Sequence, residues 1–373
     1  MLKIDRYIAK SGYDRIRCHA NPVALPLGDG ALMLTQKLLI SAIDCFSEVS
    51  YFTSSDGGAS WGDPEAVPVL PDVTAADGSR EGYNTSVLHY CKDDGSVLVM
   101  VTTYNYNALN KLDRSLPQQV KYFYFYPEEK RWSTPQLLPL PAPEGAGVLA
   151  VNAPLTILDN GDFLLPYSVK NSGFTAKIAR IRRSGDGSLS VVDESREFCC
   201  DAGRGVLEPS LALFQGKYYL SLRNDESGMV ACSEDWHDFP ELKKWCFSDG
   251  SWLGNCNTMT RLLGIKGKLY LVYTRQGLNN DHVFRNRAPL LIGQVDTATL
   301  TVIRASEQVV VPEHGARLGN FTAVSQSENQ AYVSVAEWMQ TLEPEWFDCK
   351  KCEEYGADNR IWYVTLKKDR REI

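Results

Sequence analysis

Two carboxylates in this sequence stand where a side chain could transfer a proton. Glu208 begins the segment EPSLALFQGKYYLSLR, whereas five segments built in the same way begin with asparagine. Asp44 lies in LLISAIDCFSEVSYF, an otherwise apolar stretch, where loss of water would raise its pKa and let it donate a proton. A loop aspartate that only caps a turn is the alternative interpretation for Asp44. The two side chains are candidates for general acid–base chemistry.

The repeated segments indicate which elements would position these side chains. Each has a polar residue, an apolar run, a turn and a second apolar run, which is typical of a β-hairpin. Further strand-like runs lie between the copies, and no amphipathic helical pattern interrupts the series. The sequence therefore predicts an all-β fold, a six-bladed β-propeller of four-stranded antiparallel blades in one domain over residues 1–373. A two-sheet sandwich is the alternative, but it does not explain why the hairpin segment recurs at regular intervals along the chain.

The first residue of each hairpin would face the mouth of the central channel, because the innermost strand of each propeller blade lines that channel. Besides Glu208, the residues in this position are Asn21, Asn84, Asn152, Asn257 and Asn320. Asparagine can also cap the start of a strand by bonding its own backbone. Both a structural and a substrate-binding role therefore stay open for the five asparagines, whereas a carboxylate at the mouth favours a function.

The turn TSSDGGASW, residues 53–61, is polar yet ends on a tryptophan. Asp56 can accept hydrogen bonds from turn amides, the glycines permit positive φ, and Trp61 can pack back onto its blade. The pattern S-x-D-x-G-x-[ST]-W resembles the Asp-box of the sialidase (neuraminidase) superfamily, in which the turn joins the third and fourth strands of a blade, away from the mouth. The chain as a whole is similar to that superfamily. Three further segments match it in order: EPSLALFQGKYYLSLR, RAPL and VSVAEW.

The resemblance implies three arginines that hold a substrate carboxylate, since a planar guanidinium matches a carboxylate with two bonds. Arg223 matches the second of them and Arg287 the third, with Arg275 as a rival for the third. Arg17 is the candidate for the first, and Arg15 is its alternate. The Ile-Pro that follows the first arginine in the family is missing here.

The resemblance also implies roles for the acidic residues. Asp44 matches the family's acid, Glu208 its general base, and Glu337 the glutamate that braces the arginines. The sequence departs from the family at its tyrosine nucleophile, because the matching residues 320–321 are Asn-Phe. Tyr83, at the mouth of the second repeat, is the substitute candidate; otherwise Asp44 and Glu208 would act as an ordinary carboxylate pair.

His282 is a further polar candidate. It lies in GLNNDHVFRNR, a loop that we expect on the mouth side. It could orient a hydroxyl group or accept a proton, and a purely structural histidine is the equal alternative.

Composition limits the partners and the location. A net charge of −7 offers no broad basic surface to nucleic acid or anionic lipid, and no apolar run approaches the length of a membrane span. The N-terminal segment lacks the features of a secretory signal, so the ten cysteines are expected to be reduced thiols in a cytoplasmic protein. A structural zinc at Cys349 and Cys352 is disfavoured, because no second pair matches their spacing.

Together these features predict a glycoside hydrolase of the sialidase superfamily. It would act from the end of a chain on a terminal, carboxylated sugar of a small molecule or an oligosaccharide, without a cofactor. Two alternatives remain: another exo-glycosidase or a uronate lyase on the same scaffold, and a non-catalytic carbohydrate-binding propeller.

Overall fold

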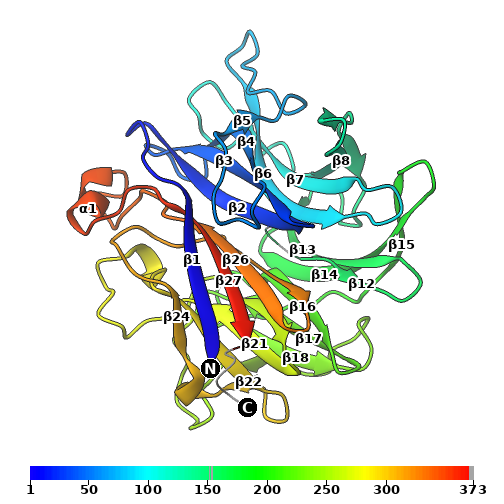
Figure 1. Cartoon of the computed structure of the whole chain (residues 1–373), viewed down its shortest axis with the longest axis vertical. Coiled ribbons are helices and arrows are strands. Elements are labelled where there is room, and N and C mark those ends of the chain that lie inside the picture. Colours follow the sequence, from blue (N-terminus) through cyan, green and yellow to red (C-terminus); the bar gives the residue numbers. More distant parts are fainter. Residues whose placement is uncertain (151, 153, 369–373) are drawn as a thin grey trace.

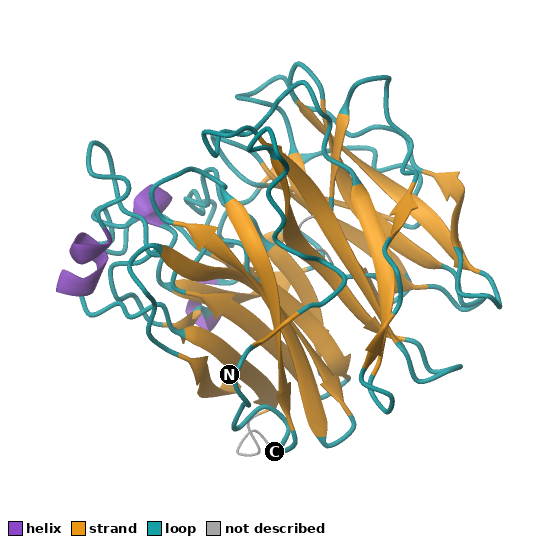
Figure 2. Cartoon of the chain, turned by 90° about the horizontal axis from the view of Figure 1, so that it is seen from above, coloured by secondary structure: helices purple, strands orange, loops and turns teal. Residues whose placement is uncertain are grey.

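The strands form six antiparallel sheets arranged in a ring (Figures 1 and 2). This computed structural model describes residues 1–150, 152 and 154–368. The predicted six-bladed β-propeller with four-stranded blades is confirmed. In blades two, three and five one short additional strand pairs beside the four. Each of the six predicted hairpins supplies inner strands of one blade, so the repeat in the sequence is the repeat in the fold.

The first three blades use the first half of the chain. Blade one contains β2 (Arg17–Leu27), β3 (Gly30–Leu39), β4 (Phe46–Ser54) and β5 (Glu65–Ala66). Blade two contains β6 (Arg80–Tyr90), β7 (Val97–Tyr106), β8 (Val120–Tyr126), β9 (Arg131–Trp132) and β10 (Gln136–Leu138). Blade three contains β11 (Gly147–Leu149), β12 (Thr156–Ile157), β13 (Phe163–Lys170), β14 (Phe174–Arg183) and β15 (Leu189–Glu194).

The last three blades follow in order. Blade four contains β16 (Leu207–Phe214), β17 (Lys217–Arg223), β18 (Met229–Ser233) and β19 (Lys243–Lys244). Blade five contains β20 (Arg261–Ile265), β21 (Lys268–Tyr273), β22 (Leu290–Asp296), β23 (Thr301–Val302) and β24 (Gln308–Val311). Blade six contains β25 (Thr322–Ser327), β26 (Gln330–Ala336), β27 (Ile361–Lys368) and β1 (Leu2–Lys10).

The helices are short: η1 (Phe284–Asn286), η2 (Arg304–Ser306) and α1 (Cys349–Glu354). Within residues 1–150, 152 and 154–368, no helix has the length and hydropathy that a bilayer crossing requires.

The sixth blade joins the two ends of the chain. The strand β1 pairs antiparallel with β27, so the N-terminal strand is the outer strand of a sheet whose other three strands come from the C-terminal part. Figure 1 accordingly shows the N and C labels close together. Arg6 of β1 also donates hydrogen bonds of 2.6 and 2.8 Å to the carbonyls of Val309 and Val310 in blade five. The ring is therefore closed by backbone pairing between the chain's ends.

Apolar side chains from neighbouring blades pack together and form the core. One cluster joins Leu98 and Met100 of blade two to Leu165 and Tyr167 of blade three. Because both faces of a blade are covered by its neighbours, inner strands are apolar on both faces, as the wholly buried run VLVMV in β7 illustrates. This packing explains why the strands read as continuous apolar runs.

The turn at residues 53–61 joins β4 to β5, the third and fourth strands of blade one. The backbone N–H and the hydroxyl of Ser60 donate to the carboxylate of Asp56 at 2.9 and 2.6 Å. The Trp61 indole donates to the Gly58 carbonyl, and its ring lies 5.4 Å from that of Tyr363 in β27. Gly58 has φ of +91°, and an added Cβ would lie 2.3 Å from the Tyr363 ring. The turn therefore packs blade one against blade six.

We expect Asp56→Ala to lower the melting temperature of the protein without changing the binding of any ligand in the channel. The hydrogen bonds from Ser60 and Ser54 lower the pKa of Asp56 to about 2, so its stabilising effect is present above pH 3.8 and is lost as the pH falls through about 2. Calorimetry of Asp56→Ala beside Asp63→Ala, an exposed aspartate just after the turn, measures the effect. Equal melting temperatures for the two variants would contradict it.

Candidate active site

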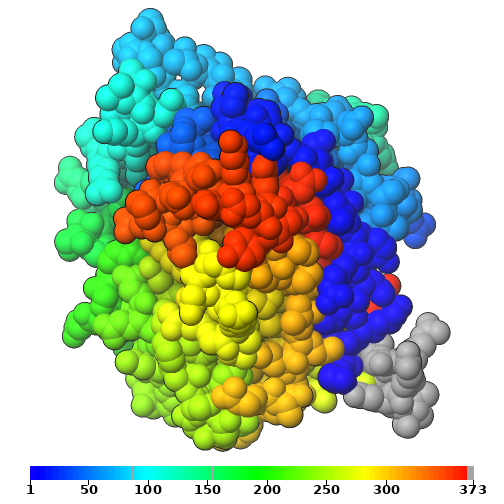
Figure 3. Space-filling view, turned by 90° about the vertical axis from the view of Figure 1, so that its left-hand side faces the viewer, coloured from blue at the N-terminus to red at the C-terminus, as the bar shows by residue number. Residues whose placement is uncertain are grey.

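A cavity of about 540 Å³ opens at one end of the ring and is lined by residues from all six blades. Figure 3 looks at the face that carries α1, where the segment around α1 lies beside the segment around residue 280. The stacked rings of His282 and Tyr355, 4.1 Å apart, join these two segments. Seven of the lining residues are arginine or lysine and two are acidic, in a chain whose net charge is −7. The cavity is therefore the electropositive part of an acidic protein.

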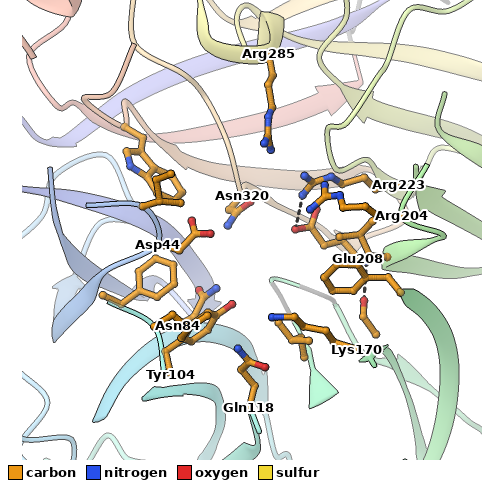
Figure 4. Close-up of a pocket in the computed structure, with 18 of the residues that line it drawn as sticks. Asp44, Asn84, Tyr104, Gln118, Lys170, Arg204, Glu208, Arg223, Arg285 and Asn320 are labelled. Atoms are coloured by element: carbon orange, nitrogen blue, oxygen red, sulfur yellow. Dashed lines mark hydrogen bonds and ion pairs between the residues drawn. The ribbon is translucent and has the colours of Figure 1, made fainter. Parts of the chain in front are cut away.

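Glu208 lies on one side of this cavity, and Asp44 faces it from the other (Figure 4). Glu208 has φ of +50°, at a register irregularity between Leu207 and Ser210 of β16. Asn21, Asn152, Asn257 and Asn320 also have positive φ, but asparagine tolerates this conformation whereas glutamate seldom adopts it. Strained backbone of this kind is retained mainly at functional sites. The glutamate is thus held at a cost in the position that asparagine occupies elsewhere.

The charge state of Glu208 follows from its neighbours. Its Oε1 accepts a hydrogen bond of 2.8 Å from Arg223, while its buried Oε2 has no partner. Burial alone would raise the pKa of Glu208, but the charges of Arg223 and Arg287 outweigh it and lower that pKa. At neutral pH Glu208 is therefore a carboxylate, suited to act as a base, a nucleophile or a stabiliser of positive charge.

Three buried guanidinium groups surround one side of the cavity. The residues Arg223, Arg287 and Arg317 are 6, 3 and 5% exposed. Arg287 donates to the carbonyl of Asn257, and Arg317 donates to Gln340 at 2.8 Å and stacks 3.5 Å above the ring of Trp338. Within the described part of the chain, the Nε atoms of Arg287 and Arg317 have no hydrogen-bond partner. Burial and the neighbouring arginines lower the pKa of Arg287, and burial lowers that of Arg317 to about 10.

The only carboxylate that pairs with this buried cluster, within the described part of the chain, is Glu208 on Arg223. Buried charge without a counter-ion is costly, so the arrangement is complete only when an anion binds there.

Asp44 lies in the loop between β3 and β4, with φ of +49°. Tyr106 fixes this loop, since its hydroxyl donates to the Asp44 carbonyl at 2.5 Å and accepts from the Phe46 N–H at 2.9 Å. The desolvation expected for Asp44 is wrong, because its side chain is exposed at the cavity. The apolar neighbours Ile40 and Phe46 pack inward, which leaves Asp44 facing the open space.

Tyr104 and Lys170 also line the cavity, and the sequence interpretation missed both. Tyr104 lies in β7 and hydrogen bonds to Asn84; burial, followed by the charge of Asp44, raises its pKa. Lys170 is the last residue of β13, the second strand of its blade, as Arg223 is the last of β17. A polar residue at the end of the second strand of a hairpin is therefore a sequence signal that would have indicated Lys170.

Several predicted residues lie away from the cavity. Arg17 is exposed at the start of β2, and Arg15 pairs with Glu353 at 3.0 Å, so neither joins the buried arginines. Arg317, which precedes blade six, is the third member of the buried cluster instead. Arg275 pairs with Glu307 at 2.7 Å, which excludes it as a substitute for Arg287.

Three further assignments need correction. Glu337 accepts hydrogen bonds from Arg360 and His314, both at 2.9 Å, and so braces neither Arg287 nor Arg317. His282 pairs with Glu313 at 3.0 Å and does not line the cavity. Tyr83 is buried, hydrogen bonds to Glu81 and is not among the cavity residues, so its hydroxyl does not reach the site.

The asparagines separate into two groups. Asn84 and Asn320 line the cavity, and both are drawn facing it in Figure 4. Asn257 lies behind Arg223 and accepts a hydrogen bond of 3.1 Å from its Nε. Asn152 lies in the channel and donates to Thr322 at 3.1 Å. Asn152 and Asn257 therefore have a structural role, because they bond to neighbouring side chains and do not line the cavity.

Metal ligands are not grouped in this structure. Among the described residues, no three His, Cys, Asp or Glu side chains are arranged to hold a metal ion. Cys349 and Cys352 are buried free thiols of α1.

The chain matches no protein-family model and no curated protein. Among solved structures it resembles a protein of unknown function from Dyadobacter fermentans, with 15% identity, a TM-score of 0.66 and coverage of 98% of this chain and 99% of that one. The endosialidase of phage phi92 is 11% identical, with a TM-score of 0.66 and coverage of 100 and 70%. A Trypanosoma rangeli sialidase is 13% identical, with a TM-score of 0.61, and this chain covers 55% of its length. At such identities the likeness shows the fold alone.

Proposed function

We propose that this protein is a glycoside hydrolase that removes a terminal sugar bearing a carboxylate. The observation that carries the proposal is the cluster of three buried guanidinium groups of Arg223, Arg287 and Arg317, of which only Arg223 pairs with a carboxylate among the described residues. A planar carboxylate can accept paired hydrogen bonds from such groups and neutralise them. The likeness in fold to sialidases and an endosialidase supports the same substrate class.

The two carboxylates take different roles in this proposal. Asp44 faces Glu208 across the cavity, where a bound sugar would shield it from water, and it donates a proton to the oxygen of the leaving group (Figure 4). Glu208, held ionised by the charges of Arg223 and Arg287, stabilises the positive charge that develops on the sugar or bonds to it. Water then adds to the sugar carbon, and its proton returns to a carboxylate, so one bond to oxygen breaks and one forms. A cytoplasmic location goes with this proposal and is supported by the free state of all ten cysteines.

A panel of aryl glycosides tests the proposal. Chromophore release is expected from glycosides of acidic sugars and not from the neutral sugars that match them. Turnover of neutral sugars alone would overturn the proposed substrate class.

We expect Asp44→Asn to slow the release of poor leaving groups by about 10²–10⁴-fold, the usual contribution of a general acid. Glycosides of acidic phenols need little help from an acid, so their hydrolysis is expected to change far less. Measuring kcat/KM across phenols of graded pKa with both proteins gives this dependence. An equal loss for every leaving group would mean that Asp44 does not donate the proton.

A second candidate activity is that of a uronate lyase, favoured by Tyr104 and Lys170 at the cavity. Burial, helped by the charge of Arg114, lowers the pKa of Lys170, so its ammonium group gives up a proton more readily and its amine could then remove the proton beside a sugar carboxylate. Tyr104, whose pKa is raised, could protonate the leaving oxygen while the new double bond forms. Ultraviolet absorption by an unsaturated product distinguishes this elimination from hydrolysis.

A further inference from the structure

The wall of the cavity formed by blades two, three and four carries a second group of cations, which the proposed hydrolysis does not use. Its members are Arg114, Lys170 and Arg204, here called the basic wall. Gln118 and Asn171 line the cavity beside them and add amide donors. Figure 4 shows Lys170, Arg204 and Gln118 arranged around the same open space.

The carboxylates that act on the basic wall do so mainly at Arg204, which pairs with Asp225 and also feels the charges of Glu208 and Asp44. Within residues 1–150, 152 and 154–368, neither Arg114 nor Lys170 forms a salt bridge, and Arg204 pairs with Asp225 at 2.8 Å. Asp44 is the acidic group that acts on Lys170 from across the cavity. Burial of Lys170 beside Arg114 and Arg204 lowers its pKa, which a bound anion would reverse.

The basic wall lies next to the buried arginines. Arg204 and Arg223 donate to the same amide oxygen, Oδ1 of Asn257, at 3.2 Å from Arg204 Nη2 and 3.1 Å from Arg223 Nε. The two guanidinium groups therefore lie side by side across one oxygen atom. A sugar whose carboxylate reaches Arg223 places its own substituents, or the adjoining sugar, beside the basic wall.

We propose that the substrate carries a second anionic group, a carboxylate or a sulfate ester, that binds to the basic wall. This inference rests on the proposed function, because the first anion is the sugar carboxylate held by the buried arginines. It narrows the substrate class from acidic sugars to saccharides with two negative charges on one sugar or on two adjoining ones.

Selenate, a tetrahedral dianion visible by anomalous scattering, tests both anion sites in crystals of the full chain. Two selenium peaks are expected in the wild-type cavity, one at the buried arginines and one at the basic wall. Lys170→Gln is expected to reduce the occupancy at the basic wall several-fold and to spare the other peak. Lys111→Gln removes the same charge from an exposed position in the loop of Arg114 and is expected to keep both peaks.

The outcomes separate the two proposals. The second site is overturned if no peak lies at the basic wall. It is also overturned if Lys170→Gln leaves that peak unchanged, because the peak is then an adventitious ion only. Neither result affects the proposed function. No peak at the buried arginines counts against the proposed function itself. Selenate-containing crystals are then soaked with one of two compounds. The first is a disaccharide of two identical acidic sugars, and the second is a uronate disaccharide with one sulfate ester. If the dimer displaces both selenate ions, the second anionic group is a carboxylate; if the sulfated disaccharide displaces both, it is a sulfate ester. If each compound displaces only the selenate at the buried arginines, the inference is overturned.

Discussion

Glu208→Gln is expected to lower kcat by about 10³-fold or more while the protein remains folded, because the amide can neither accept a proton nor offset positive charge on the sugar. The amide oxygen can still accept the hydrogen bond that Arg223 donates at 2.8 Å, so the site keeps its shape. The pKa of Glu208 is lowered, and its ionised form is the active one. The acidic limb of the wild-type profile of kcat/KM is therefore expected below pH 4.5 and is lost in the variant.

Glu226→Gln is the matched control. Glu226 is an exposed glutamate in the loop that follows β17, in the same blade as Glu208. Its variant is expected to keep wild-type kcat and the acidic limb. If Glu208→Gln turned over an acidic aryl glycoside as fast as Glu226→Gln does, the site would lie elsewhere.

Arg287→Met is expected to make the protein more stable and to impair binding of the acidic sugar. Arg287 is 3% exposed, and among the described residues its Nε has no hydrogen-bond partner and its guanidinium pairs with no carboxylate. Replacing buried charge by an apolar side chain of similar length often stabilises a protein by about 1–4 kcal/mol. Loss of a buried charge that pairs with a ligand costs about 2–5 kcal/mol of binding free energy. Denaturant unfolding and calorimetric titration with a monocarboxylated sugar measure the two effects.

Arg275→Met gives the opposite pattern and serves as control. Arg275 belongs to the same blade but donates two hydrogen bonds, of 2.9 and 2.7 Å, to Glu307. Its loss removes the ion-pair partner of Glu307 and leaves that carboxylate the hydrogen bond from the Tyr273 hydroxyl, so we expect lower stability with unchanged affinity. If Arg287→Met destabilised the protein as Arg275→Met does and bound the sugar normally, Arg287 would be a structural residue.

The architecture could be predicted because each blade repeats the same local pattern. Turn residues such as Asn160-Gly161 and Lys266-Gly267 specify tight hairpins, and the apolar runs on either side need cover on both faces. The starts of the inner strands were less predictable. Asn152 and Asn257 lie before β12 and β20, whereas Asn84 lies within β6.

The cavity was only partly predictable, because its residues come from loops whose paths depend on the closed ring. Glu208 begins a repeated hairpin, so local reasoning placed it, and the family resemblance placed Arg223 on the paired strand of the same hairpin. Arg317 lies in the segment between β24 and β25, and its contacts with Trp338 and Gln340 hold it at the cavity. Arg17 was the candidate for the first arginine because it precedes blade one in the sequence, but its side chain is exposed to solvent at the start of β2.

The pairing of β1 with β27 has a consequence for synthesis on the ribosome. Asp44 emerges early and Arg317 late, yet the charge of Asp44 acts on that of Arg317 across the junction of blades one and six. A nascent chain can fold its first sheets as they emerge, but the six-bladed cavity stays incomplete until β27 has left the exit tunnel. Premature termination near the last strand should therefore yield an open arc of sheets with an exposed apolar flank and no affinity for acidic saccharides.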